Sequence, residues 1–150
     1  MKRIVCILTF LSIILCFSSC DLILSFYAPE SLKDRAEAHL GIELDDATVI
    51  EEWDNHGGFH GDGETFVKLL CPDGFEDKLT AEWKTLPLEG EAYTYFYEWG
   101  GFFEHYETGE KLIPEIKDGS WYFKSSGELN WDLAIFDYEE NILYYYEFDS

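Results

Sequence analysis

Residues 54–64, with the sequence DNHGGFHGDGE, combine two histidines, three acids, an asparagine and four glycines. His56 and His60 are four residues apart, which is the spacing at which two histidines on one face of a helix share a zinc ion. Asp62 and Glu64 would add carboxylate oxygens, which suit both zinc and calcium. The residue types therefore indicate a cation site formed by His56, His60, Asp62 and Glu64.

The glycines weaken this interpretation, because each costs up to about 1 kcal/mol relative to alanine inside a helix. On a straight strand, four residues span about 13 Å, which is too far for one zinc ion with nitrogen ligands about 2.1 Å away. A metal site therefore requires the segment to fold back on itself. The alternative, which we favour, is a glycine-rich hairpin connection with Phe59 packed on the core.

The segments on either side must position this stretch. Residues 48–53 and 65–70 each alternate in the two-residue period of a β-strand. Two such runs around a glycine cluster predict a hairpin, with residues 54–64 as its connection.

Two other segments have the spacing of helices. In residues 29–40, Leu32, Ala36 and Leu40 recur every four residues, and Gly41 suits the position after a helix. His39 falls in the last turn, where we expect a surface or capping residue. A second helix, ended by Pro87, is predicted by an apolar stripe at Phe75, Leu79, Trp83 and Leu86.

The second half of the chain is rich in aromatic residues with β-type alternation. Residues 92–99 predict a strand, residues 121–123 a short strand, and residues 131–137 and 142–149 a hairpin joined by residues 138–141. We therefore expect an α+β fold, in which about two helices pack on one face of an antiparallel β-sheet.

Six tyrosines in the predicted strands allow two interpretations: Tyr93, Tyr95, Tyr97, Tyr144, Tyr145 and Tyr146. They could form a platform on which sugar rings stack, as would suit a protein near a cell wall. They could also pack within the sheet, because tyrosine tolerates a half-buried position. We favour packing.

The charge of the chain limits its partners. The formal net charge is −21, and aromatic residues make up 18% of the sequence. So many aromatic residues argue against a disordered acidic tail and favour a folded domain with an acidic surface. Such a surface repels phosphate backbones, so nucleic acid is excluded as a partner, and a macromolecular partner should be basic or neutral.

The N-terminus has the order of an export signal. Lys2 and Arg3 precede the apolar run of residues 4–17, and Ser18 and Ser19 follow it. This run of fourteen residues, broken only by Thr9 and Ser12, is too short for a transmembrane helix, which needs about 20.

The end of this signal, FSSC at residues 17–20, resembles the lipobox of bacterial lipoproteins, although Phe17 replaces the usual aliphatic residue. The resemblance implies that a diacylglyceryl group is attached to Cys20 and that cleavage occurs just before it. Residues 1–19 would be the signal peptide, residues 20–28 a short lipid-anchored tether, and residues 29–150 one domain. The protein would lie on the outer face of the cytoplasmic membrane, held in the lipid bilayer through acylated Cys20.

An ordinary secretory signal with Cys20 as a free thiol is the alternative. Cysteine usage argues against it, because Cys6 and Cys16 leave with the signal and only Cys71 remains as a partner. If Cys20 is acylated, we expect Cys71 to be unpaired and buried.

The mature chain also resembles small uncharacterised lipoproteins of Gram-positive bacteria, through HGGFHGDGETFVKL and LAIFDYEENILYYYEFDS. That resemblance implies no activity. We find no nucleophile elbow and no phosphate-binding glycine loop, so no catalytic residue is assigned. We therefore expect a non-enzymatic binding module for a basic protein or a cell-wall ligand, with no cofactor. The alternatives are a calcium- or zinc-dependent surface protein or hydrolase using residues 54–64, and an immunity-type inhibitor of a basic toxin.

Overall fold

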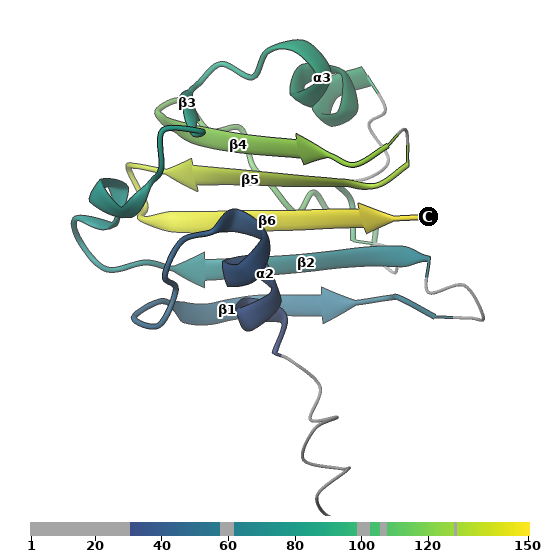
Figure 1. Cartoon of the computed structure of the whole chain (residues 1–150), viewed down its shortest axis with the longest axis horizontal. Coiled ribbons are helices and arrows are strands. Elements are labelled where there is room, and N and C mark those ends of the chain that lie inside the picture. The colour runs from purple at the N-terminus through teal and green to yellow at the C-terminus, as the bar shows by residue number, and fades with distance from the viewer. Residues whose placement is uncertain (1–30, 58–61, 99–102, 106–107, 128) are drawn as a thin grey trace, which may run out of the picture. The chain divides into compact units, whose positions relative to one another are not determined.

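The computed structural model describes residues 31–57, 62–98, 103–105, 108–127 and 129–150 (Figure 1). Residues 31–150 form one compact unit built around a six-stranded antiparallel sheet with the order β1-β2-β6-β5-β4-β3. The strands are β1 (Thr48–Asp54), β2 (Gly63–Leu70), β3 (Lys84–Thr85), β4 (Gly119–Ser125), β5 (Trp131–Asp137) and β6 (Ile142–Asp149). Within the described ranges, no helix is long and apolar enough to cross a membrane.

Both predicted hairpins are confirmed. β1 pairs with β2 from Thr48↔Leu70 to Asp54↔Thr65, with a bulge between Val49 and Glu51. β5 and β6 form the second hairpin, and β6 also pairs with β2 along its whole length. The C-terminal strand therefore joins the two hairpins at the centre of the sheet.

The first predicted helix is also confirmed, as α2 (Leu32–Leu40). Ser31 and Asp34 form a capping box at its start, and Gly41 ends it in the left-handed conformation with φ 64°. Ala36 and Leu40 are buried against the sheet, as the four-residue spacing predicts. Residue 29, which was expected in the first turn, lies outside the described ranges.

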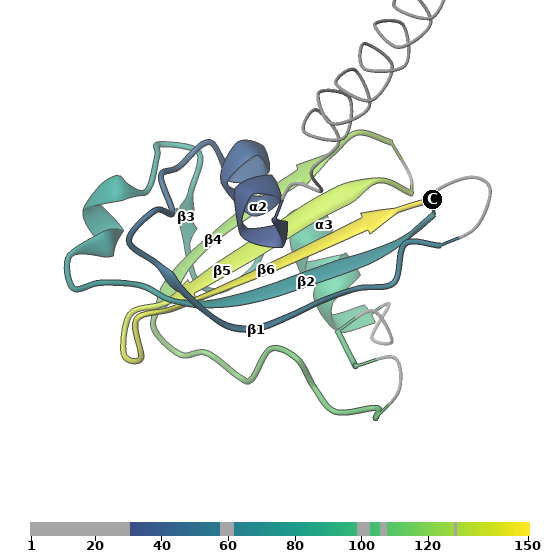
Figure 2. The same ribbon diagram turned by 90° about the horizontal axis from the view of Figure 1, so that it is seen from below.

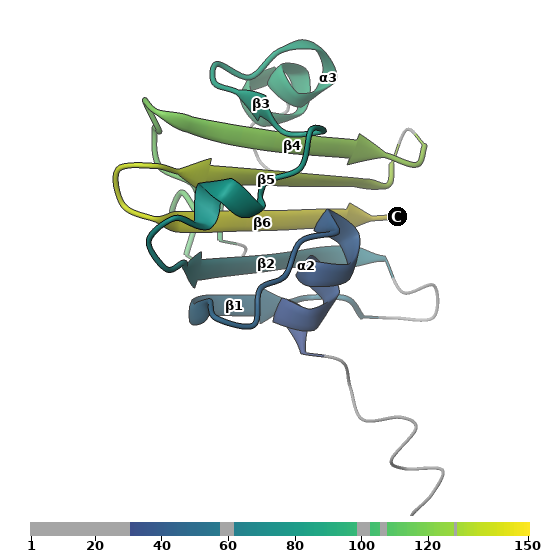
Figure 3. The same ribbon diagram turned by 60° about the vertical axis from the view of Figure 1, so that its left-hand side comes forward.

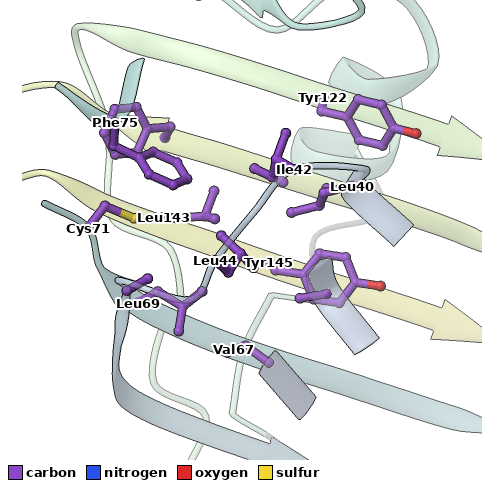
Figure 4. Packing of buried hydrophobic residues seen from close by; sticks show 14 of the residues in the cluster. Leu40, Ile42, Leu44, Val67, Leu69, Cys71, Phe75, Tyr122, Leu143 and Tyr145 are labelled. Carbon is purple, nitrogen blue, oxygen red and sulfur yellow. The ribbon is translucent and has the colours of Figure 1, made fainter. Parts of the chain in front are cut away.

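The predicted α+β fold with two helices on one face is wrong. Among the described residues, the structure is mostly antiparallel sheet, and the two short α-helices lie on opposite faces, α2 on one and α3 (Gly90–Tyr93) on the other (Figure 2). The α2 face buries Leu44, Leu69, Leu143 and Tyr145, among others (Figure 4). The other face has a separate core that includes Phe66, Trp131, Leu133 and Tyr146. Both faces of the central strands are therefore covered.

The helix predicted over residues 75–86 is wrong as well. A 3₁₀ turn, η1 (Phe75–Lys78), lies on the same face as α2, and the chain then extends into β3 at the sheet edge (Figure 3). Phe75 and Trp83 pack in the core under α2, whereas Leu86 packs against the core of the opposite face. Because the segment passes around the sheet edge, one straight helix cannot bury both ends.

The strand predicted over residues 92–99 is also wrong for residues 92–98, and residue 99 lies outside the described residues. This segment forms α3 and then a π-helical turn, η2 (Thr94–Glu98). Ala92 and Tyr95 point into the core, where the Tyr95 ring lies 5.1 Å from that of Trp131. Ala92 and Tyr95 are three residues apart, so only a helical backbone can bury both on one side. This burial outweighs the β preference of the tyrosines.

Candidate functional site

One row of polar residues crosses the sheet beneath α2. The strand registers align Asp54, Thr65, Glu147, Asp132 and Lys124, one from each of five strands. Directly opposed residues in antiparallel strands point to the same face, so these side chains form a continuous polar row. Asp132 lies directly opposite Glu147. This position is unfavourable for two carboxylates, because like charges across a strand pair repel each other.

Helix α2 supplies two basic side chains above this row. Arg35 and His39 are four residues apart and therefore lie on one side of the helix. Arg35 Nη2 donates to Glu147 Oε1 at 2.9 Å, and Arg35 Nη1 lies 3.7 Å from Asp54 Oδ2. His39 Nδ1 lies 3.0 Å from Asp132 Oδ1. The helix thus places one basic group over each of the opposed carboxylates.

The hydroxyl of Tyr145 is the centre of this cluster. It lies 2.9 Å from His39 Nδ1, 2.9 Å from Asp132 Oδ1 and 3.2 Å from Glu147 Oε2. Burial, and then the negative charges of Asp132 and Glu147, raise the pKa of Tyr145 far above its ordinary value, so the phenol stays neutral. Its single proton can satisfy only one carboxylate. Both carboxylates are satisfied when Tyr145 donates to Glu147 and His39 donates from Nδ1 to Asp132.

The cluster is open to solvent on one side. The His39 side chain is 37% exposed and that of Asp132 is 13% exposed. Both line a surface pocket of about 220 Å³ together with Ala38, Lys124 and Ser126. His39, Asp132 and Glu147 have ligand atoms within 4.8 Å of one another, and they are the one such group of three metal-ligating side chains among the described residues.

The predicted cation site in residues 54–64 is only partly described. Asp54 Oδ1 accepts from the His56 backbone N–H at 2.7 Å and lies 2.6 Å from His56 Nδ1. Glu64 donates its backbone N–H to Asn55 Oδ1 at 2.6 Å, and its carboxylate accepts from Asn55 Nδ2 at 3.3 Å. The His56 side chain thus contacts Asp54, the Glu64 side chain contacts Asn55, and Asp62 is exposed. His60 lies outside the described residues, so the four-residue cation site stays a prediction.

Gly63 has a steric role in this connection. A Cβ added at Gly63 would lie 2.5 Å from His56 Cα, so only glycine lets the two ends of the connection approach this closely. The backbone of Gly57 also donates to Asp62 O at 3.5 Å. The described ends of residues 54–64 therefore form the start of a hairpin connection. Phe59, expected to pack on the core, lies outside the described residues.

The six tyrosines do not form one platform. Tyr95 and the three tyrosines of β6 are buried, which confirms packing for those four. Tyr93 and Tyr97 are 45% and 57% exposed, and their rings lie 4.9 Å apart. Tyr97 also lines a shallow pocket of about 190 Å³.

Of the two cysteines in the predicted mature chain, only Cys71 lies in the described residues. Cys71 is a free, buried thiol, as expected, and burial raises its pKa to about 12. Cys20, the predicted lipidation site, lies outside the described residues.

Seven exposed acids gather at the other end of the strands. The registers align Thr48, Leu70, Ile142 and Asp137 at that end, so the connections next to them lie together. Asn141 donates to Asp73 at 3.4 Å, which ties two of these connections to each other. We define this acidic end by the exposed residues Asp45, Asp46, Asp73, Glu76, Asp77, Glu139 and Glu140. Lys78 offsets part of this charge by pairing with Asp46 at 3.5 Å.

Sequence reasoning missed the role of His39, which was expected at the surface or as a helix cap. One signal was present, because a four-residue connection at residues 138–141 places Asp132 opposite Glu147 in the predicted hairpin. Two opposed acids on the face that also carries Tyr145 require a partner from another element. The sequence alone does not identify that element as α2.

No protein-family model, curated protein or solved structure matches this chain.

Proposed function

We propose that the protein is a lipid-anchored binding module on the outer face of the bacterial cytoplasmic membrane, and that its acidic end binds a basic protein. The observation that carries this proposal is the gathering of seven exposed acids from three connections at one end of the sheet. Charge complementarity of this kind steers encounter and suppresses binding of acidic partners.

The rigidity of the acidic end supports a binding role. The β5–β6 connection is fixed by Asp137 Oδ1, which accepts from the backbone N–H groups of Glu139 at 2.9 Å and Glu140 at 3.4 Å. The backbone N–H of Cys71 donates to Asn141 O at 2.8 Å, joining this turn to the chain after β2. Preorganised charges lose less conformational entropy on binding than charges on a flexible tail.

An inhibitor of the immunity type is a specific form of this proposal. The acidic end would then cover the basic active surface of a toxin and neutralise it. A gene for a basic toxin next to the gene for this protein would favour this form.

The acidic end can be tested with a ten-residue lysine peptide as the probe. One variant replaces four acids of the acidic end by their amides: Glu76→Gln, Asp77→Asn, Glu139→Gln and Glu140→Gln. The matched control removes four exposed charges elsewhere: Glu89→Gln, Glu91→Gln, Glu104→Gln and Glu110→Gln. Calorimetry at low ionic strength should show binding about tenfold weaker for the first variant than for the control. Equal losses in both would mean that net charge, and not this end, binds the peptide.

The anchor can be tested through Cys20. In cells fed radiolabelled palmitate, Cys20→Ser should abolish labelling of the protein and release it from the membrane fraction. Cys71→Ser is the control and should leave both unchanged, because that thiol is buried in the domain. Membrane retention of an unlabelled Cys20→Ser protein would contradict the anchor.

A further inference from the structure

The opposed carboxylates beneath α2 favour a bound cation. Asp132 and Glu147 together carry two negative charges, and Arg35 neutralises one of them through its 2.9 Å contact with Glu147. Their direct opposition across β5 and β6 makes the remaining charge costly. Lys124 lies opposite Asp132 in the register of β4 and β5, and a cation bound beside His39 would supply further positive charge.

We propose that His39, Asp132 and Glu147 form a binding site for a divalent transition-metal ion of the zinc type. Their ligand atoms lie within 4.8 Å of one another, and His39 Nδ1 is 3.0 Å from Asp132 Oδ1. Two ligands on a tetrahedral zinc ion lie about 3.4 Å apart, given bonds of about 2.1 Å. The first pair thus lies close to the spacing of two zinc ligands, and a small side-chain rotation of Glu147 completes the set.

The donor set favours zinc over calcium. One imidazole nitrogen and two carboxylates are ligands of the zinc type, whereas calcium takes about six to eight oxygen ligands. Three protein ligands leave a fourth position for water. The pocket of about 220 Å³ beside His39 and Asp132 gives an ion and that water a route from solvent.

Two further side chains hold the ligands in place. Arg35 binds Glu147 through Oε1 at 2.9 Å, so the ion would use the lone pair of Oε2 that does not accept from Tyr145. The Tyr145 hydroxyl, buried beside all three ligands, donates to a carboxylate oxygen. Such hydrogen bonds from outside the coordination shell orient metal ligands. Zinc needs the lone pair of His39 Nδ1, so the ring proton must lie on Nε2 when the ion is bound.

The site is separate from the predicted site in residues 54–64 and does not depend on the proposed acidic-end function. Calorimetry of ZnCl₂ binding to the full chain in detergent micelles tests it. We expect saturable binding of one zinc ion per chain. His39→Gln and Asp132→Asn should each weaken zinc binding about tenfold or more. The His56→Ala control should leave it unchanged.

Each alternative outcome overturns the proposal. The proposal is overturned if no saturable zinc binding is seen up to about 1 mM. It is also overturned if His39→Gln leaves the zinc affinity unchanged. Loss of binding in His56→Ala with retention in His39→Gln would assign the ion to residues 54–64.

A measurement on the unmodified chain covers the case in which a variant fails to fold. Co²⁺ in place of zinc should give the intense visible absorption of a four-coordinate ion, and ZnCl₂ should remove it. Weak absorption, typical of fully hydrated cobalt, would count against the site.

Discussion

The hydroxyl of Tyr145 offers a direct test of how the buried cluster contributes to stability. Tyr145→Phe removes one oxygen atom and leaves the ring, so packing in the core is conserved. The lost group lies within 3.2 Å of two carboxylates and one imidazole, in a residue with no exposed surface. A hydrogen bond to a charged group contributes about 1.5–3 kcal/mol. We therefore expect the free energy of unfolding to fall by about 2 kcal/mol.

Urea denaturation followed by tryptophan fluorescence, in the presence of a chelator, measures this change. For a domain of this size, 2 kcal/mol corresponds to a Tm about 8 °C lower. Tyr122→Phe is the matched control, because Tyr122 is buried in the same core. Its hydroxyl has no hydrogen-bond partner within the part of the chain that the structure describes, so its loss should change stability by less than about 0.5 kcal/mol.

A double-mutant cycle assigns the effect to the carboxylates. Tyr145→Phe combined with Glu147→Gln should be less destabilising than the sum of the single changes, because both remove the same contact. If Tyr145→Phe and Tyr122→Phe have equal effects, or if the cycle is additive, the hydroxyl does not support the opposed carboxylates and the reasoning is refuted.

Three further predictions concern other buried groups. Burial raises the pKa of Tyr145 and Tyr146 above the unfolded value of about 10, so both favour folding below that pH. Urea denaturation between pH 9 and 11 should show stability falling above about pH 10, by about 1.4 kcal/mol per pH unit for each tyrosine; a flat profile would contradict this. The Cys71 thiol, with a pKa of about 12, should resist a disulfide reagent in the folded protein and react in urea; equal rates would contradict its burial. Gly119→Ala should destabilise the protein by about 2 kcal/mol or more, because the added Cβ would collide with the Phe136 carbonyl. Thermal melts measure this loss. The control is Gly57→Ala, whose added Cβ would meet only an ordinary contact of 3.6 Å, so it should leave the Tm nearly unchanged.

Local sequence patterns predicted the structure correctly where a helix or hairpin packs on a single core. Helix α2 follows from its four-residue stripe, its capping residues and Gly41, all of which act within a few residues of one another. The β5–β6 hairpin follows from strict alternation around a short connection. In both cases the residues that set the pattern in the sequence are the ones that form the contacts in the folded protein.

Local patterns failed where a segment packs on two different cores. Residues 75–86 have helical spacing, but Phe75 and Leu86 bury their side chains on opposite faces of the sheet. Residues 92–98 alternate like a strand, but they form a helical turn in which Tyr95 packs against Trp131. Spacing along the chain cannot show which distant surface a side chain will meet.

The sequence by itself determined the acidic charge and the strands that form the two hairpins, and the export signal stays a prediction from it. The tertiary structure decided that both faces of the sheet are covered and that Arg35 and His39 lie over three acids, Asp54, Asp132 and Glu147, which come from three different strands. The physical reason is distance in sequence. His39 and Asp132 are separated by 93 residues, and only the packing of α2 on the assembled sheet brings their charges to 3.0 Å.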